Sequence, residues 1–256
     1  MILSHSNEFI FIHCKKTAGS SIKGYLSQFL GPRDIQIGAW KHALKNGKQF
    51  NRQFYLDLIH PKVSLNLDVY KRLYVLWNRN SKIKGILNSL QKYRYKPTFE
   101  NPAHPTAEEI KEFDPASWSK YFKFCFTRNP YEKVVSEYIF RMSLEGKQRI
   151  DFEDFVEKVW KSNKSKDENT VSSRLKDWQM FTINGTIDVD FVGKYEELHS
   201  GFREVCNRID VPFESQLMPE AKRIKQYDYK SYYGEKEKKL IDKMFKKEIE
   251  YFGYEF

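Results

Sequence analysis

Two stretches of the chain share one order of apolar and polar positions. Residues 9–12 are apolar without interruption, which is typical of a short strand buried on both faces of a parallel sheet. The small and polar residues 17–21 follow, and apolar residues then recur at helical spacing until Gly31-Pro32. A strand, a small-residue loop and a helix in this order direct backbone N–H groups at an anion, although an ordinary βα turn has the same pattern.

The second stretch repeats this order. Residues 121–126 alternate, with three phenylalanines on one face, and predict a strand. Arg128 follows, and then Asn129 and Pro130 suit the N-cap and first position of a helix over residues 130–142. Two such turns can meet at the carboxyl edge of a parallel sheet, where open α/β folds bind ligands.

The other patterns are more local. They predict a short helix that begins at the capping box of Thr106 and Glu109, a helix over residues 150–160, a hairpin at Asn184-Gly185, a strand over residues 189–193 and a last helix over about residues 236–251. Residues 44–105 show only short helical patterns, and we interpret them as an insertion or lid on the core.

Composition narrows the class of protein. The 256 residues are 40% hydrophobic and 16% aromatic, which indicates one folded α/β domain rather than a disordered chain. Lysine and arginine number 44 against 34 acidic residues, for a net charge of +10, so we expect anionic partners. The basic residues are spread out, which argues against a nucleic-acid-binding arm.

The cysteines and the apolar runs bear on location. Cys14, Cys125 and Cys206 are widely spaced, so the sequence predicts neither a disulfide framework nor a zinc site. No leader pattern precedes the first strand, and no run approaches transmembrane length. We therefore expect a cytoplasmic protein whose charge allows peripheral contact with a membrane.

The motifs resemble those of PAPS-dependent sulfotransferases, in the carbohydrate-type branch. Residues 13–22 are similar to the loop that holds the 5′-phosphosulfate in that family, and residues 124–138 to its 3′-phosphate motif. Residues 190–198 resemble its adenine-side turn, and residues 251–256 resemble the C-terminal end of proteins in that branch. The resemblance implies a P-loop-like three-layer α/β fold with a central, mainly parallel sheet flanked by helices, in a single domain over residues 1–256.

The resemblance also implies a reaction. A sulfuryl group would pass from PAPS to an acceptor hydroxyl, on a glycan or glycolipid, and leave 3′,5′-adenosine bisphosphate, with no metal and no nucleic acid involved. Lys16 would neutralise the leaving phosphate. The residues that would bind the cofactor are Lys16, Thr17, Ala18, Gly19, Ser20 and Ser21 in the first loop, Arg128 and Ser136, Tyr195, and the basic Arg223, Lys225 and Lys230.

Two positions depart from the family pattern. Lys15 stands where the family usually has proline, and it adds a second cation to the loop. Ala18 replaces the first glycine of the pattern. If Ala18 must adopt a positive φ, the loop carries strain, because only glycine takes that conformation without cost.

The general base is assigned to His42, which follows the first helix in a Lys-His-Ala segment similar to one in this branch. His60 and His104 are alternatives within residues 44–105, and His13 ends a buried strand, where a structural role is expected. Acceptor-side candidates are Arg174, Trp178 and Gln179, although helix packing explains them equally well.

Two other classes of function remain open. A P-loop kinase or NTPase fits the first strand and loop, but its glycine-rich pattern ending in Gly-Lys-Ser/Thr is absent. A non-catalytic protein that binds nucleic acid or an anionic glycan would rest on the net charge alone.

Overall fold

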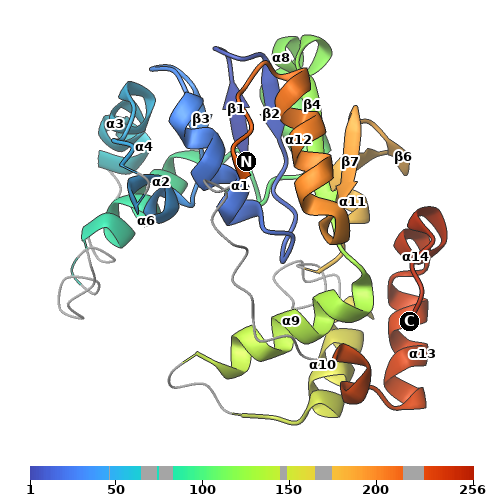
Figure 1. Cartoon of the computed structure of the whole chain (residues 1–256). Coiled ribbons are helices and arrows are strands. Elements are labelled where there is room, and N and C mark those ends of the chain that lie inside the picture. Colours follow the sequence, from blue (N-terminus) through green and yellow to red (C-terminus); the bar gives the residue numbers. More distant parts are fainter. Residues whose placement is uncertain (46, 65–73, 75–82, 145–148, 165–174, 216–227) are drawn as a thin grey trace.

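The computed structural model describes residues 1–45, 47–64, 74, 83–144, 149–164, 175–215 and 228–256. Its centre is a five-stranded sheet in the order β3-β1-β2-β4-β7 (Figure 1). The strands are β1 (Ile2–Ser4), β2 (Phe9–Phe11), β3 (Ile35–Gln36), β4 (Phe122–Thr127) and β7 (Phe191–Lys194).

The predicted parallel sheet is confirmed for its middle strands only. β4 runs parallel to both β2 and β7, with Phe124 opposite Phe11 on one side and Phe191 on the other. β1 pairs antiparallel with both β2 and β3, so the sheet is mixed. The sequence interpretation missed β1 and β3, which have three and two residues and show no alternation long enough to recognise.

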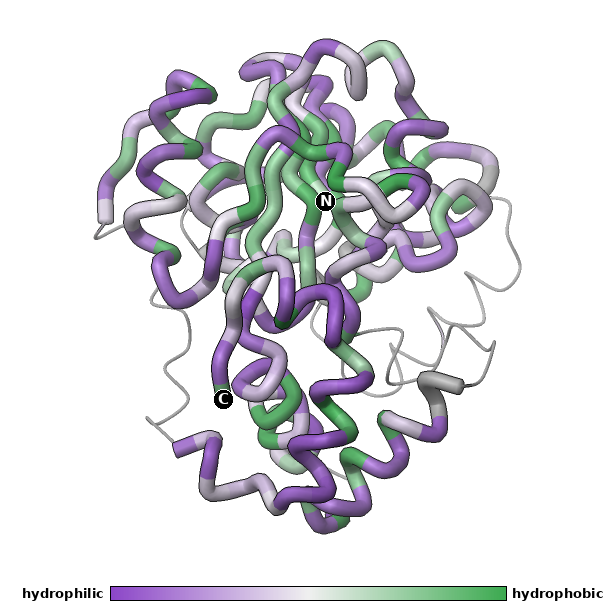
Figure 2. The backbone as a smooth tube through the Cα atoms, turned by 90° about the vertical axis from the view of Figure 1, so that its right-hand side faces the viewer, coloured by the Kyte–Doolittle hydropathy of each residue, from purple (hydrophilic) through white to green (hydrophobic). Residues whose placement is uncertain are grey.

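Helices cover both faces of the sheet. On one face, α1 (Gly19–Leu26) and α12 (Leu198–Arg208) pack against the phenylalanines of β2 and β4. The other face is covered by α6 (Ile83–Tyr95), α7 (Ala107–Phe113), α8 (Pro115–Lys120) and α11 (Trp178–Phe181). Hydrophobic residues, green in Figure 2, gather on the central strands, as expected for a sheet buried on both faces.

A second hydrophobic core lies beyond the carboxyl end of β4, below the sheet in Figure 1. It joins α9 (Pro130–Met142), α10 (Phe152–Lys164), α13 (Glu235–Met244) and α14 (Lys246–Phe252). The start of α9 is as predicted, because the Asn129 side chain caps it and Pro130 occupies its first turn. The last helix was predicted as one piece over residues 236–251, but it is broken at Phe245.

The remaining helices lie at the β3 edge. They are α2 (Trp40–Lys45), α3 (Arg52–Ile59) and α4 (Pro61–Ser64), and α3 and α4 both pack on α6. The C-terminal part of the predicted insertion, residues 44–105, also belongs to the main core, because Tyr95 and Phe99 pack beneath the sheet.

The local turn predictions are confirmed. α7 begins at the capping box of Thr106 and Glu109. Asn184 and Gly185 both have positive φ between β5 (Thr182–Ile183) and β6 (Thr186–Ile187), as the hairpin requires. In the part of the chain that the structure describes, no helix is long and apolar enough to cross a membrane.

Candidate active site

The loop between β2 and α1 is held in a tight left-handed conformation. Lys16 and Ala18 have φ of 62° and 58°, so the positive φ considered for Ala18 is present. The Thr17 hydroxyl donates to the Cys14 carbonyl at 2.9 Å, and the Ser21 amide donates to the Ala18 carbonyl at 2.8 Å. The Ser21 N–H is thus already bonded within the loop, so the amides of Thr17 to Ser20 are the candidates for binding an anion.

Gly19 allows the loop to close against His13. A Cβ atom at Gly19 would lie 1.9 Å from the His13 Cδ2 atom, which no side chain could tolerate. Glycine is therefore required here by close approach, because the imidazole ring occupies the space of a side chain. His13 thus lies directly beside the first turn of α1.

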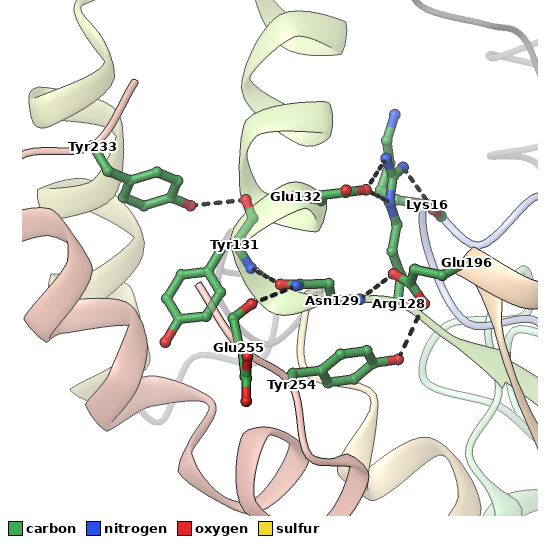
Figure 3. Close-up of polar contacts among 9 residues, drawn as sticks. All are labelled: Lys16, Arg128, Asn129, Tyr131, Glu132, Glu196, Tyr233, Tyr254 and Glu255. Atoms are coloured by element: carbon green, nitrogen blue, oxygen red, sulfur yellow. Dashed lines mark hydrogen bonds and ion pairs between the residues drawn. The ribbon is translucent and has the colours of Figure 1, made fainter. Parts of the chain in front are cut away.

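Arg128 connects the two predicted turns (Figure 3). Its Nη1 donates to the Lys16 carbonyl at 3.3 Å, and its Nη2 donates to Glu132 Oε2 at 3.0 Å. The guanidinium also lies over the Tyr195 ring, 4.3 Å from its centroid. The Nε atom also donates to Glu132 Oε2, at 3.3 Å, so three hydrogen bonds fix the plane of a side chain that has five N–H donors.

The turn that carries Arg128 is itself held from two distant segments (Figure 3). Glu196 accepts the Asn129 N–H at 2.8 Å, and it also accepts the Tyr254 hydroxyl at 3.5 Å. The Asn129 side-chain amide donates to the Glu255 carbonyl at 2.9 Å. The segment after α14 therefore helps to set the position of Arg128.

A cavity of about 670 Å³ opens beside the loop. Lys15, Lys16 and Ser20 line it from the loop side, and the Lys16 ammonium lies 4.6 Å from the centre of the Phe140 ring on α9. The other residues around it combine apolar and basic side chains: Phe140, Arg141, Met142, Leu144, Ile150, Phe155 and Lys158, with His13, His104 and Glu137. A basic cavity at a helix N-terminus suits an anionic ligand.

His104 lines this cavity and a second one of about 660 Å³. Its Nδ1 lies 2.7 Å from the His13 carbonyl, which can only accept, so Nδ1 carries the proton and Nε2 is the basic nitrogen. The His104 and His13 rings are 4.5 Å apart. Burial lowers the pKa of both imidazoles well below the usual range, and the lysines nearby lower it further. His104 is therefore neutral near pH 7, with Nε2 unprotonated.

The second cavity is mainly polar. It is lined by Glu100, Asn101, Thr106, Glu108, Glu109, Lys176, Asp177, Gln179, Met180, Thr182, Asn184 and Gly185, together with His13, Lys15 and His104. Asp177 forms a 2.5 Å ion pair with Lys133, and both side chains are almost fully buried. Burial outweighs this pairing and raises the pKa of Asp177 to about 6. The pair joins α9 to the segment before α11.

The other residues predicted for the site lie in different surroundings. Ser136 is on α9 but is buried and lines neither of these cavities. Lys230 is in the 3₁₀ helix η4 (Tyr229–Tyr232), with its ammonium 5.5 Å from the centre of the Phe256 ring. Arg223, Lys225 and Arg174 lie outside the described residues.

His42 is placed away from the loop. It packs against Gly24 in the interior of α1, where a Cβ atom added at position 24 would lie 2.9 Å from the His42 Cβ. It lines neither of the two cavities. Of the histidines that the sequence offered as a base, the structure brings His104 next to the loop, together with His13.

Sequence reasoning missed three supporting residues. Glu196, Lys133 and Asp177 each act through contacts with residues far along the chain. Lys133 showed no local signal, because Glu132 precedes it and a lysine there resembles a surface position, whereas in the structure it is 2% exposed. A buried lysine requires an acidic partner, and Asp177 provides it.

Comparison with known proteins shows the family of the chain. The model of the sulfotransferase family matches residues 1–255, which is nearly the whole chain. The chain belongs to the sulfotransferase family. Membership of this family supports an enzyme that transfers sulfuryl groups.

This sulfotransferase is also similar to an uncharacterised protein of Archaeoglobus fulgidus. The two are 30% identical over 94 residues, which cover 37% of this chain and 72% of the relative. No solved structure matches the chain. Among the described residues of the sulfotransferase, no group of three or more His, Cys, Asp or Glu side chains could hold a metal ion.

Proposed function

We propose that this sulfotransferase uses PAPS as its donor. The observation that carries the proposal is the contact of Arg128 Nη1 with the Lys16 carbonyl, 112 residues away. This contact brings one cation-bearing turn against another, as a ligand with a phosphate at each end requires. PAPS supplies the sulfuryl group and, when the bond breaks, a phosphate leaving group.

The residues of the two turns fit such a donor. Lys16, Ser20 and the first turn of α1 offer a cation, a hydroxyl and a helix N-terminus to the 5′ end. Arg128, whose orientation is fixed by Glu132 and Tyr195, offers a fork of N–H donors to the 3′-phosphate. Ser136, Tyr195 and Lys230, and also Arg223 and Lys225, remain proposed donor contacts that rest on the motif.

We propose that His104 is the general base, in preference to His42. The His13 carbonyl holds the protonated Nδ1 of His104 and leaves Nε2 to take the proton from an acceptor hydroxyl. His104 also lines both cavities, so it lies between the basic one and the polar one. Lys16 would meanwhile stabilise the negative charge that develops on the leaving phosphate.

We propose a carbohydrate acceptor, bound in the polar cavity. Side-chain amides and hydroxyls of Asn101, Gln179, Thr182 and Asn184 line it, and these groups match the hydroxyls of a sugar. The three cysteines are free and buried, which suits a reducing compartment, and we propose a cytoplasmic location.

The donor is tested by calorimetry with 3′,5′-adenosine bisphosphate. We expect the wild-type protein to bind it, and Lys16→Ala or Arg128→Ala to weaken binding about 10–100-fold, because each removes charged hydrogen bonds. Lys246→Ala is the matched control, since that lysine is 72% exposed on α14 and should leave binding unchanged. Absence of binding by the wild-type protein would overturn the proposed donor.

A further inference from the structure

One face of α3 exposes an apolar stripe. Tyr55, Leu56 and Ile59 are 55%, 41% and 69% exposed, and they follow Arg52 at spacings of three, four and seven residues. Residues at this spacing lie on one side of a helix. Isolated apolar side chains are common on a protein surface. A continuous row of them is costly to expose to water and marks an interaction site.

The opposite face of α3 fixes how the helix is turned. Phe54 is fully buried against Trp40, with the ring centroids 5.0 Å apart. Asp57 is also buried, and it accepts hydrogen bonds from Gln91 at 2.9 Å and from Tyr95 at 2.8 Å. Rotating α3 to hide the stripe would break these bonds, so the exposed side is determined by the core.

The stripe begins at the exposed Arg52 and belongs to a part of the chain that is rich in basic residues. Residues 40–64 and 83–99, which form α2, α3, α4 and α6, contain nine basic residues: Lys41, Lys45, Lys48, Arg52, Lys62, Lys84, Lys92, Arg94 and Lys96. Their one acidic residue is Asp57, whose carboxylate is buried. Within these two ranges, exposed apolar side chains therefore occur together with positive charge, and the one carboxylate is buried.

We propose that the α3 stripe docks on an anionic lipid membrane. A bilayer with acidic headgroups supplies both an apolar layer for Leu56 and Ile59 and negative charge for Arg52 and its neighbours. Tyr55 suits the boundary, because its ring is apolar and its hydroxyl is polar. A nucleic acid would satisfy the charge but would give the aliphatic side chains no apolar surface.

The test is co-sedimentation of the full chain with vesicles. We expect binding to vesicles of phosphatidylcholine and phosphatidylserine in equal parts, weak binding to phosphatidylcholine alone, and release as salt is raised. The double variant Leu56→Ser/Ile59→Ser should lower the partition coefficient by about tenfold or more, because it removes most of the apolar area. Arg52→Glu should lower binding to the acidic vesicles and leave binding to the neutral ones unchanged.

Tyr251→Ser is the matched control, because Tyr251 is 61% exposed on α14 and lies outside the stripe. It should bind vesicles like the wild-type protein. Binding of 3′,5′-adenosine bisphosphate and the circular dichroism spectrum report whether each variant is folded. The proposal fails if acidic vesicles are not preferred or if the double variant binds them normally. It also fails if light scattering shows a dimer that the double variant disperses, since the stripe then binds a second copy.

Discussion

The backbone of Ala18 is in a region that costs an L-residue about 1–2 kcal/mol. Glycine does not pay this steric cost, but it loses more conformational entropy on folding. We therefore expect Ala18→Gly to raise the free energy of unfolding by about 1 kcal/mol or less, and urea denaturation would measure it.

Ala116→Gly provides the matched control for this prediction. Ala116 is exposed within α8, where glycine is a poorer helix former, so we expect that change to lower stability by about 0.5–1 kcal/mol. Equal losses in the two variants would show that the left-handed conformation of Ala18 carries no strain.

His104 is the residue on which the proposed chemistry depends most. His104→Gln should lower kcat about 10²–10⁴-fold and leave the affinity for 3′,5′-adenosine bisphosphate unchanged, because glutamine cannot take a proton. The same two measurements on His42→Gln compare the two assignments directly. The variant that loses kcat while it keeps the nucleotide identifies the base.

The pH dependence of the rate follows from the same imidazole. Burial lowers the pKa of His104, so its neutral form persists below the usual value of about 6.5. The rate should therefore stay constant from pH 8 through about 6.5 and fall only at more acidic pH, where His104 becomes protonated. A rate that already declines between pH 8 and 7 as the pH falls would point to another base.

At the scale of elements, the β4–α9 unit orients the cation of the second turn. Glu196 bonds both to the Asn129 N–H and to the Tyr254 hydroxyl, so it connects this unit to η2 (Tyr195–Glu197) and to the segment after α14. We expect Glu196→Ala to raise the Kd for 3′,5′-adenosine bisphosphate about tenfold, because Arg128 loses its fixed position.

Glu197→Ala is the matched control, since the neighbouring Glu197 has no side-chain cap bond at the start of α12. Calorimetry should show unchanged affinity for it. Thermal melting distinguishes a local effect from unfolding, and a Glu196→Ala protein that melts far below the wild type would make its loss of binding uninformative about Arg128. The milder Glu196→Gln, which keeps one acceptor, would then replace it.

The elements that the sequence predicted well are those with local signals. The start of α9 follows from Asn129 and Pro130, and the β5–β6 hairpin from Asn184-Gly185, since these residue types fix the backbone by themselves. β1 and β3 are too short to show a period. The break between α13 and α14 at Phe245 carries no glycine or proline, so no local signal announced it.

The same distinction applies to the site. The approach of Lys16 and Arg128 was predictable, because β2 and β4 are adjacent parallel strands and their following turns share one edge. The contact of His104 with His13 was not, since it depends on how a segment without clear period returns to the sheet. The lack of a local pattern, more than sequence separation, limited the prediction, because Lys16 and Arg128 are 112 residues apart and His13 and His104 only 91.

At the scale of the whole molecule, the cavity beside Lys16 lies between two hydrophobic cores. The loop belongs to the sheet core, whereas Phe140 and Phe155 come from α9 and α10 of the second one. A ligand held by both parts stabilises the folded protein by mass action. At about 100 times its Kd, 3′,5′-adenosine bisphosphate should add about 2.7 kcal/mol of stability and raise Tm by about 5–10 °C.

Thermal melting with and without the nucleotide measures this rise. Arg128→Ala at the same nucleotide concentration serves as the control and should show a much smaller shift. Inorganic phosphate at an equal concentration should give little stabilisation, because it lacks the adenosine and can fill only one of the two proposed phosphate sites. A large shift with phosphate alone would argue against a ligand that spans the two turns.

The bond between Asn129 and Glu255 has a consequence for folding. It joins residues 126 positions apart, so the chain must close a long loop before the turn that carries Arg128 is complete. Contacts of such high sequence separation form late, after local helices and neighbouring strands. During refolding, helical structure should therefore return before the capacity to bind nucleotide, and an early intermediate would be compact but unable to hold the donor.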